Sequence, residues 1–268
     1  MNKQLRTLKV LNIFAFIAMV AVNIAAQTMP LGGFTTQEIS AFYPTLLTPA
    51  GITFAIWSVI YLLTGWFVFQ QAFSANDQMT EKTGWLFAVT CALNIAWIVS
   101  WHYQMMLFAT VIIVALWVCL LQLYRRTDRQ PWHLKTGFTI YYAWITVATA
   151  VQVFIYLALV IPAIHVQRTA VTITIAVLAA LTILALRKIF SAHDYFFGLT
   201  VAWSIFGIFL SHLGEGYNKM YPLIVLVSGL CTLILVASLL IQVMQNERPT
   251  MLPDTPADPA EPLPEAGK

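Results

Sequence analysis

Eight long apolar stretches, none containing an Asp, Glu, Lys or Arg, follow one another along the chain. They cover residues 10–26, 50–73, 84–101, 105–124, 136–161, 169–186, 195–213 and 221–243. Each has roughly the length of a helix that crosses about 30 Å of hydrocarbon. Within lipid, a single segment satisfies its backbone hydrogen bonds only as a helix. The sequence therefore predicts an all-α integral membrane protein, an eight-helix transmembrane bundle.

The composition excludes a water-soluble core. Hydrophobic residues make up 60% of the chain and charged residues 9%, and the mean hydropathy is +0.78. In a soluble domain, charged residues make up about a quarter. The connections between the stretches are too short for a soluble catalytic domain, so any chemistry belongs to the bundle or its loops.

The basic residues predict how the chain is oriented. Of the 14 Lys and Arg residues, 12 fall on the side of the N-terminus, and only Arg168 and Lys219 fall opposite. Short cytoplasmic loops retain basic residues during insertion. We therefore expect a multi-pass protein, in the bacterial inner membrane, with both termini cytoplasmic. The net charge of +3 suits contact with anionic headgroups of the lipid bilayer, and no nucleic-acid partner is implied.

The first stretch has an alternative interpretation as a signal peptide. Three basic residues precede it, and it ends in the small residues Ala25 and Ala26, as cleaved signals do. Cleavage would leave seven spans, the layout of a receptor or a rhodopsin. A retinal pigment needs a lysine within the bilayer, and Lys135, Lys188 and Lys219 all fall in loops or at span ends.

The loop at residues 27–49 is the longest connection between spans. Thr36, Glu38 and Ile39 predict a short interfacial helix that ends before Pro44. Such a helix could cap a cavity that opens between the spans, or the loop could be a mere connector. The last segment, 245–268, holds six prolines and several acidic residues, a composition that predicts a disordered tail.

Polar and aromatic residues recur at helical spacing in three spans. The second span has Trp57, Tyr61 and Thr64, the third has Asn94, Trp97 and Trp101, and the fifth has Tyr141, Trp144, Ala148 and Gln152. An unpaired amide within lipid costs several kcal/mol, so Asn94 and Gln152 should face a neighbouring helix or a cavity. Two interpretations stay open. The amides pair between helices while the indoles pack or anchor at the interface, or the stripes line a ligand pocket.

The usual marks of catalysis are missing from the sequence. There is no Ser-His-Asp order, Walker loop, metal-binding His-x-x-x-His or intramembrane carboxylate pair. Cys91, Cys119 and Cys231 all fall within apolar spans, where cysteine acts as a small packing residue. We therefore predict no catalytic residue, no metal site and no resident cofactor.

Three histidines and one glutamate offer an alternative metal site. His102, His165 and His212 project to the same predicted face of the membrane, where they could gather with Glu215 around a metal or haem iron. Single histidines at span ends are more often interfacial, and the separation of these three along the chain favours that interpretation.

Three segments resemble the TspO/MBR family, the translocator or tryptophan-rich sensory proteins. Residues 49–65 are similar to the family's proline-led entry to its second helix, with a Trp, a Tyr and a Gly. Residues 93–97 are similar to Leu-Asn-x-x-Trp of its third helix. Residues 141–152 follow its fifth-helix pattern of Tyr, Trp, small residues and a terminal amide, here Gln152 in place of the usual Asn. Two features depart: Thr53-Phe54-Ala55 replaces Phe-Gly-Pro, and the first loop lacks Trp.

The resemblance implies a division of the chain, because the family has five helices. Residues 1–162 would form a TspO-like five-helix bundle, 163–244 three additional transmembrane helices, and 245–268 the disordered acidic cytoplasmic tail. It also implies binding of a flat hydrophobic ligand, a tetrapyrrole such as a porphyrin or haem, or a sterol-like lipid, in a sensory or ligand-transfer role. The implied contacts are Trp57, Tyr61, Asn94, Trp97, Tyr141, Trp144 and Gln152.

Other functions remain open at this point. Light-dependent porphyrin degradation has been attributed to the family, although no residue here is singled out as catalytic. A secondary transporter or permease for a small lipophilic solute is an alternative, but its usual intramembrane charged residue is absent from every span. A regulatory membrane subunit is a third, with a membrane-protein partner on the last three helices or the tail.

Overall fold

The computed structural model describes residues 3–29, 31–73, 77–128, 130–165, 167–214 and 220–246. Within these ranges the chain forms helices joined by turns, without a strand. The elements are α1 (Lys3–Thr28), η1 (Leu31–Gly33), α2 (Thr36–Phe42), η2 (Gly51–Ala55), α3 (Ile56–Phe73), α4 (Gln78–Thr83), α5 (Leu86–His102), α6 (Met106–Thr127), α7 (Trp132–Val160), η3 (Pro162–His165), α8 (Gln167–Ala192), α9 (Tyr195–Leu213) and α10 (Pro222–Asn246). The predicted tail lies outside the described residues.

Seven of the described helices are long and apolar enough to cross a membrane: α1, α3 with η2, and α6 to α10. The third predicted span corresponds to α5, which has only 17 residues and is therefore about 25 Å long. All eight predicted stretches are helical, which confirms an all-helical, multi-pass membrane protein. The count of eight complete spans is not confirmed, because α5 is shorter than a typical span.

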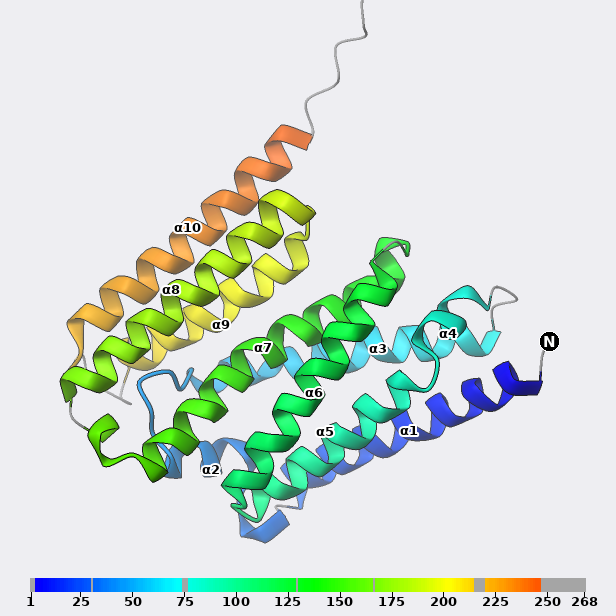
Figure 1. Cartoon of the computed structure of the whole chain (residues 1–268), viewed down its shortest axis with the longest axis horizontal. Coiled ribbons are helices and arrows are strands. Elements are labelled where there is room, and N and C mark those ends of the chain that lie inside the picture. Colours follow the sequence, from blue (N-terminus) through cyan, green and yellow to red (C-terminus); the bar gives the residue numbers. More distant parts are fainter. Residues whose placement is uncertain are drawn as a thin grey trace, which may run out of the picture.

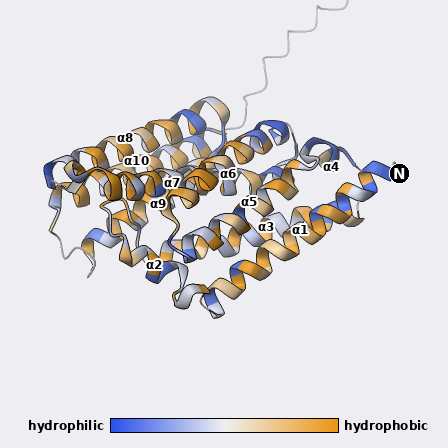
Figure 2. Cartoon of the chain, turned by 60° about the horizontal axis from the view of Figure 1, so that its bottom comes forward, coloured by the Kyte–Doolittle hydropathy of each residue, from blue (hydrophilic) through white to orange (hydrophobic). Residues whose placement is uncertain are grey.

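The first five long helices form a closed ring. In order around it, α1 packs on α3, α3 on α7, α7 on α6, α6 on α5, and α5 on α1. The remaining helices, α8, α9 and α10, pack on one another as a separate layer, and α9 contacts α7 (Figure 1). Hydrophobic residues cover most of the helix lengths, while hydrophilic residues gather near their ends (Figure 2). We name the two ends of the bundle after the short helices there, the α2 end and the α4 end.

The short helix predicted in the first loop is confirmed as α2. Thr35 caps it in a capping box with Glu38, in which the Thr35 side chain accepts from the Glu38 backbone and Glu38 accepts from the Thr35 backbone. The helix ends at Phe42, before Pro44, because a following proline disfavours helical backbone. Its buried face consists of Thr36, Ile39 and Ser40, so α2 lies against the ring.

Close packing joins the three-helix layer to the ring at the α2 end. Gly207 of α9 lies against η2, where a Cβ atom on it would be 2.3 Å from Cγ2 of Thr53. Its carbonyl accepts a hydrogen bond from the Ala50 backbone at 2.9 Å. The Trp203 indole donates to the Thr53 carbonyl at 3.1 Å. Glycine thus allows α9 to approach closely enough to fix η2, the entry to α3.

A second junction joins the two layers at the α4 end. Lys188 of α8 donates to the hydroxyl of Tyr124 on α6 at 3.1 Å, and its ammonium lies 4.2 Å from the centroid of the same ring. Asp194 accepts from the Phe197 backbone at 3.1 Å, which caps the start of α9. These contacts hold the corner between α8 and α9 against α6.

Polar side chains also connect α1 to its neighbours at the α4 end. Lys9 forms an ion pair with Asp77 at 2.7 Å, and the Lys9 side chain is only 9% exposed. One turn further, the Asn12 amide donates to Oε1 of Gln71 on α3 at 3.2 Å. A buried charge is stable only when paired, so this pair requires α1 to stay in place.

Candidate functional site

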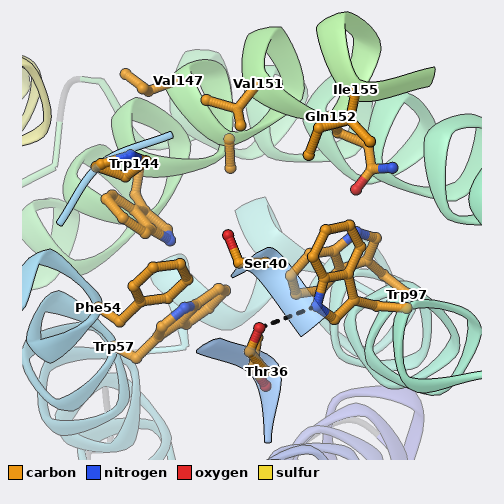
Figure 3. A pocket seen from close by; sticks show the side chains of 13 residues that line it. Thr36, Ser40, Phe54, Trp57, Trp97, Trp144, Val147, Val151, Gln152 and Ile155 are labelled. Atoms are coloured by element: carbon orange, nitrogen blue, oxygen red, sulfur yellow. Dashed lines mark hydrogen bonds between the residues drawn. The ribbon is translucent and has the colours of Figure 1, made fainter. Parts of the chain in front are cut away.

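A cavity lies inside the ring at the α2 end, and we call it the central cavity. Its wall consists of Thr36, Ser40, Pro49, Phe54, Trp57, Trp97, Trp101, Trp144, Val147, Ala148, Val151, Gln152 and Ile155. Figure 3 shows these side chains converging from α2, η2, α3, α5 and α7. The cavity is therefore built by η2 and by three helices of the ring, α3, α5 and α7, with α2 closing it.

Helix α7 supplies the longest wall. Its lining residues begin at Trp144 and end at Ile155, and each is three or four positions from another of them, which places them on one face of a helix. The lining residues between Trp144 and Gln152 are small or branched, so they leave space between α7 and the opposite wall. The polar amide of Gln152 and the indole of Trp144 thus lie at separate points of an otherwise apolar surface.

Four aromatic side chains of α3 and α5 form a row in which neighbouring planes are nearly parallel. Tyr61 and Trp57 have centroids 5.6 Å apart, with an angle of 23° between their planes. Trp57 and Trp97 are 6.4 Å apart at 27°, and Trp97 and Trp101 are 6.1 Å apart at 22°. Trp144 stands edge-on to Trp57 at 6.3 Å and 82°. Stacked and edge-on pairs are the favoured geometries of aromatic rings.

A chain of amide and hydroxyl groups runs beneath the aromatic row. Asn23 of α1 donates to Oδ1 of Asn94 on α5 at 2.7 Å. Asn94 in turn donates to the hydroxyl of Tyr141 on α7 at 2.9 Å. Asn94 is completely buried and Tyr141 is 1% exposed. The chain joins three helices of the ring, and it satisfies polar groups that lipid would otherwise leave unpaired.

Gln152 combines an interhelical contact with a place in the cavity wall. Its amide nitrogen donates to Oγ1 of Thr110 on α6 at 3.3 Å, and the residue also lines the central cavity. The interpretation that the intramembrane amides pair between helices therefore holds for both Asn94 and Gln152. For Gln152 it does not exclude the second interpretation, because the side chain contributes to both.

The seven predicted contacts fall into three groups. Trp57, Trp97, Trp144 and Gln152 line the central cavity. Tyr61 lies in the aromatic row next to Trp57 but outside this cavity. Asn94 and Tyr141 lie in the buried polar chain and do not line the central cavity. Their role as direct ligand contacts stays a prediction, while the structure gives them a role in holding the aromatic residues in place.

Several wall residues were not among the predicted contacts. Thr36 and Ser40 come from α2, which the sequence placed as a possible cap. Phe54 belongs to the segment where the chain departs from the family pattern, and Trp101 continues the third-span stripe. Asn23, which pairs with Asn94 and does not line this cavity, could also have been predicted from the sequence, because it is an amide within an apolar stretch.

Electrostatics favour an uncharged occupant. None of the described residues that line the central cavity is charged. The indole nitrogens of Trp97 and Trp144 are buried, without an acceptor among the described residues, and the Trp144 indole points into the cavity (Figure 3). Buried N–H groups are normally paired. The cavity therefore presents apolar faces and hydrogen-bond donors, which suit a lipophilic molecule with acceptor atoms.

The central cavity is narrow as it stands. Its volume is about 60 Å³. Pockets for drug-sized ligands have about 300–1,000 Å³. A flat multi-ring ligand thus needs more room than this cavity alone offers.

The histidines do not form the alternative metal site within the described residues. His102 and His212 are both buried, and Nδ1 of each lies within hydrogen-bond distance of a carbonyl of its own helix, Ile98 and Ile208. No group of three His, Cys, Asp or Glu side chains that could hold a metal occurs in the described part of the chain. Glu215 and the side chain of His165 lie outside it.

The capping box of α2 predicts a response to acid. A hydrogen bond from the Thr35 backbone, 2.7 Å long, and one from the Thr35 hydroxyl hold the pKa of Glu38 below its ordinary value of 4.5. A lowered folded-state pKa means that the stabilisation is fully present above pH 4.5 and is lost as pH falls through the lowered value. We expect α2 to loosen in acid, and Trp101, which donates to the Thr36 carbonyl, should report it by fluorescence. Glu38→Gln should remove this transition, and a transition that persists in that variant would assign it to another group.

The fold and the cavity define a multi-pass helical membrane protein with an aromatic cavity inside a five-helix ring. The family of TSPO-like proteins matches residues 9–241. The chain belongs to this family. The match crosses the predicted boundary between residues 162 and 163 and includes α8, α9 and most of α10. No match was found among curated proteins or among solved structures.

Proposed function

We propose that this protein binds a flat, hydrophobic small molecule in the aromatic cavity inside the five-helix ring. The ligand class is a tetrapyrrole such as a porphyrin, or a sterol-like lipid, and the role is sensory or one of ligand transfer. The observation that carries the proposal is the convergence of four tryptophans from α3, α5 and α7 on one cavity. Tryptophans that only anchor spans at the interface would not need to meet in the interior of a ring.

The physical basis is the match between the wall and such a ligand. Indole rings offer broad, rigid apolar faces on which a planar π-system or a fused ring system can stack. The unpaired indole N–H groups of Trp97 and Trp144 would donate to oxygen or nitrogen acceptors on the ligand. Gln152 adds an amide at the other side of the wall. A few polar groups in an apolar pocket fix the orientation of a ligand.

We propose a binding protein rather than an enzyme. The described residues that line the cavity include no His, Asp, Glu, Lys or Cys, the residue types that most often act as acids, bases or nucleophiles. What the wall supplies is stacking surface and hydrogen-bond donors.

We also propose that the α4 end faces the cytoplasm, because the ion pair of Lys9 and the basic Lys188 lie at that end, as the positive-inside rule requires.

The proposal is tested by titrating purified protein with protoporphyrin, its neutral dimethyl ester and haem while recording tryptophan fluorescence. Saturable quenching at one ligand per chain is expected for at least one of them. Trp144→Leu should weaken the affinity at least about tenfold, the loss expected when about 1.4 kcal/mol of contact is removed. Trp132→Leu is the matched control, because Trp132 is 68% exposed at the start of α7. Weak, unsaturable quenching that is the same in all three proteins would overturn the proposal.

A further inference from the structure

A larger cavity lies beside the central one, between α1 and α3, and we call it the side chamber. Its volume is about 620 Å³, roughly ten times that of the central cavity. Its wall consists of Val20, Asn23, Ile24, Gln27, Thr28, Thr36, Gln37, Phe54, Trp57, Ser58, Tyr61, Leu62 and Ile98. It exists because α1 and α3 pack closely only in their α4 halves, where a Cβ on Gly65 would be 3.1 Å from the Phe16 ring. Toward α2 the two helices separate (Figure 1).

The side chamber opens toward lipid. Ile24 of α1 and Leu62 of α3 stand on its wall and are 55% and 75% exposed. Both residues lie in membrane-spanning helices, so their exposed surface faces hydrocarbon and not water. A molecule dissolved in the bilayer can therefore enter between α1 and α3 without crossing a polar surface.

The wall of the side chamber also indicates the chemistry of its occupant. Most of its wall is apolar or aromatic, while Asn23, Gln27, Gln37 and Ser58 contribute uncharged polar groups. No charged side chain is present among the described residues of the wall. Burying a charge in such a place would cost several kcal/mol. The chamber fits an uncharged lipophile with an apolar ring system and a hydroxyl, carbonyl or ester group at one end.

A thin partition separates the side chamber from the central cavity. Thr36, Phe54 and Trp57 line both spaces, and Figure 3 shows the rings of Phe54 and Trp57 side by side at the edge of the central cavity. The Phe54 ring is also edge-on to Trp144, with centroids 6.0 Å apart. Rotation of one aromatic side chain would join the two spaces into a volume within the range of small-molecule sites.

We propose that the side chamber is the membrane-facing part of the ligand site, and that an uncharged lipophile passes through it from the bilayer to the tryptophans of the central cavity. Phe54 forms the movable partition. This inference rests on the proposed function and adds to it the route of entry, the neutral character of the ligand and contacts on α1 and α3. It also explains how a central cavity of only about 60 Å³ can form part of a site that holds a multi-ring molecule.

The test uses protein reconstituted in phosphatidylcholine vesicles, with protoporphyrin dimethyl ester dissolved in the bilayer as the probe and tryptophan quenching as the signal. Ser58→Phe places a ring in the side chamber from an exposed position of α3. We expect its association rate to fall at least about tenfold, a change of about 1.4 kcal/mol in the barrier. Val59→Phe is the control, because Val59 is 43% exposed on the same helix and lies outside the chamber.

Two further variants make the test decisive. Val20→Phe fills the chamber from α1 and should reproduce the effect of Ser58→Phe. Phe54→Ala removes the partition ring and should raise the association rate. If parent and Trp144→Leu differ in affinity while Ser58→Phe and Val20→Phe bind at the parental rate, the side chamber is overturned and the central site stands. If the parent protein shows no saturable binding of any probe, both proposals fail.

Discussion

Replacing Gly207 by leucine should lower the free energy of unfolding by about 3 kcal/mol, the upper part of the range for overpacked interiors. Even a Cβ atom at this position would lie 2.3 Å from Cγ2 of Thr53 and 3.1 Å from Cβ of Pro49. The leucine would push α9 away from η2 and break the hydrogen bond between the Ala50 backbone and the Gly207 carbonyl. Thermal unfolding in detergent measures the loss.

The matched comparison places alanine at both positions, Gly207→Ala on α9 and Gly229→Ala on α10. At Gly229 the nearest atoms to an added Cβ are at the edge of the Phe209 ring, at 3.2 Å, and this ring can turn slightly, whereas at Gly207 they are the side chain of Thr53 and the Cβ atom of Pro49, which lie closer. We expect a change of less than about 1 kcal/mol for Gly229→Ala, the range of tolerated core substitutions, and a larger loss for Gly207→Ala. Equal unfolding temperatures for Gly207→Leu and the parent protein would show that α9 does not support η2 as described.

Replacing Asn94 by alanine should be nearly as damaging, at about 2–3 kcal/mol. The change removes the centre of the chain from Asn23 through Asn94 to Tyr141 at a completely buried position. It leaves the Tyr141 hydroxyl without its donor and opens a small void, and buried groups without partners cost about 1–3 kcal/mol. Single interhelical hydrogen bonds in membranes contribute less, about 0.6 kcal/mol on average, so the larger effect depends on the coupling of both bonds.

A double-mutant cycle isolates that coupling. Tyr141→Phe removes only the hydroxyl that accepts from Asn94, and it should cost about 1 kcal/mol. In the cycle of Asn94→Ala with Tyr141→Phe, the loss in the double variant should be smaller than the sum of the single losses. Strict additivity would mean that the two side chains do not act as one unit, and the polar chain would then have no structural role.

The helices were predictable from the sequence because lipid leaves a polypeptide few alternatives. Every uncharged stretch became a helix, and the short helix predicted from Thr36, Glu38 and Ile39 is α2, which begins at Thr36. The ring and its separate three-helix layer were not predictable in detail. Both depend on which faces of neighbouring helices pack together. A contact such as that of Gly207 with Thr53 cannot be predicted from hydropathy, because a glycine within an apolar span has no distinguishing pattern there.

The candidate site was predictable in part for a related reason. Helical spacing identified Trp57, Trp97, Trp144 and Gln152, which do line one cavity. The same spacing could not separate wall residues from the neighbouring polar chain, so Asn94 was grouped with the predicted contacts although its amide pairs with Asn23 and Tyr141 and does not line the cavity. Phe54 could not be assigned, because its position follows from the 3-10 turn η2 and from the helix that holds this turn.

The layer of three helices beyond the first five contacts the segment that separates the two cavities. Through Gly207 and Trp203, α9 holds the segment that carries Phe54, the residue shared by the central cavity and the side chamber. Movement of α9 would therefore alter the partition between the two spaces. The layer of α8, α9 and α10 lies outside the ring, and through α9 it influences the shape of the site.

The most direct test of a ligand site among the tryptophans is the ligand-dependent rise in unfolding temperature, measured side by side for the parent protein and Trp144→Leu. A ligand that binds only the folded protein, at about one hundred times its dissociation constant, stabilises it by about 2.7 kcal/mol. We expect protoporphyrin dimethyl ester to raise the unfolding temperature of the parent, and Trp144→Leu to show a much smaller rise at the same concentration. Equal rises in both proteins, or none in the parent, would contradict a ligand site among these tryptophans.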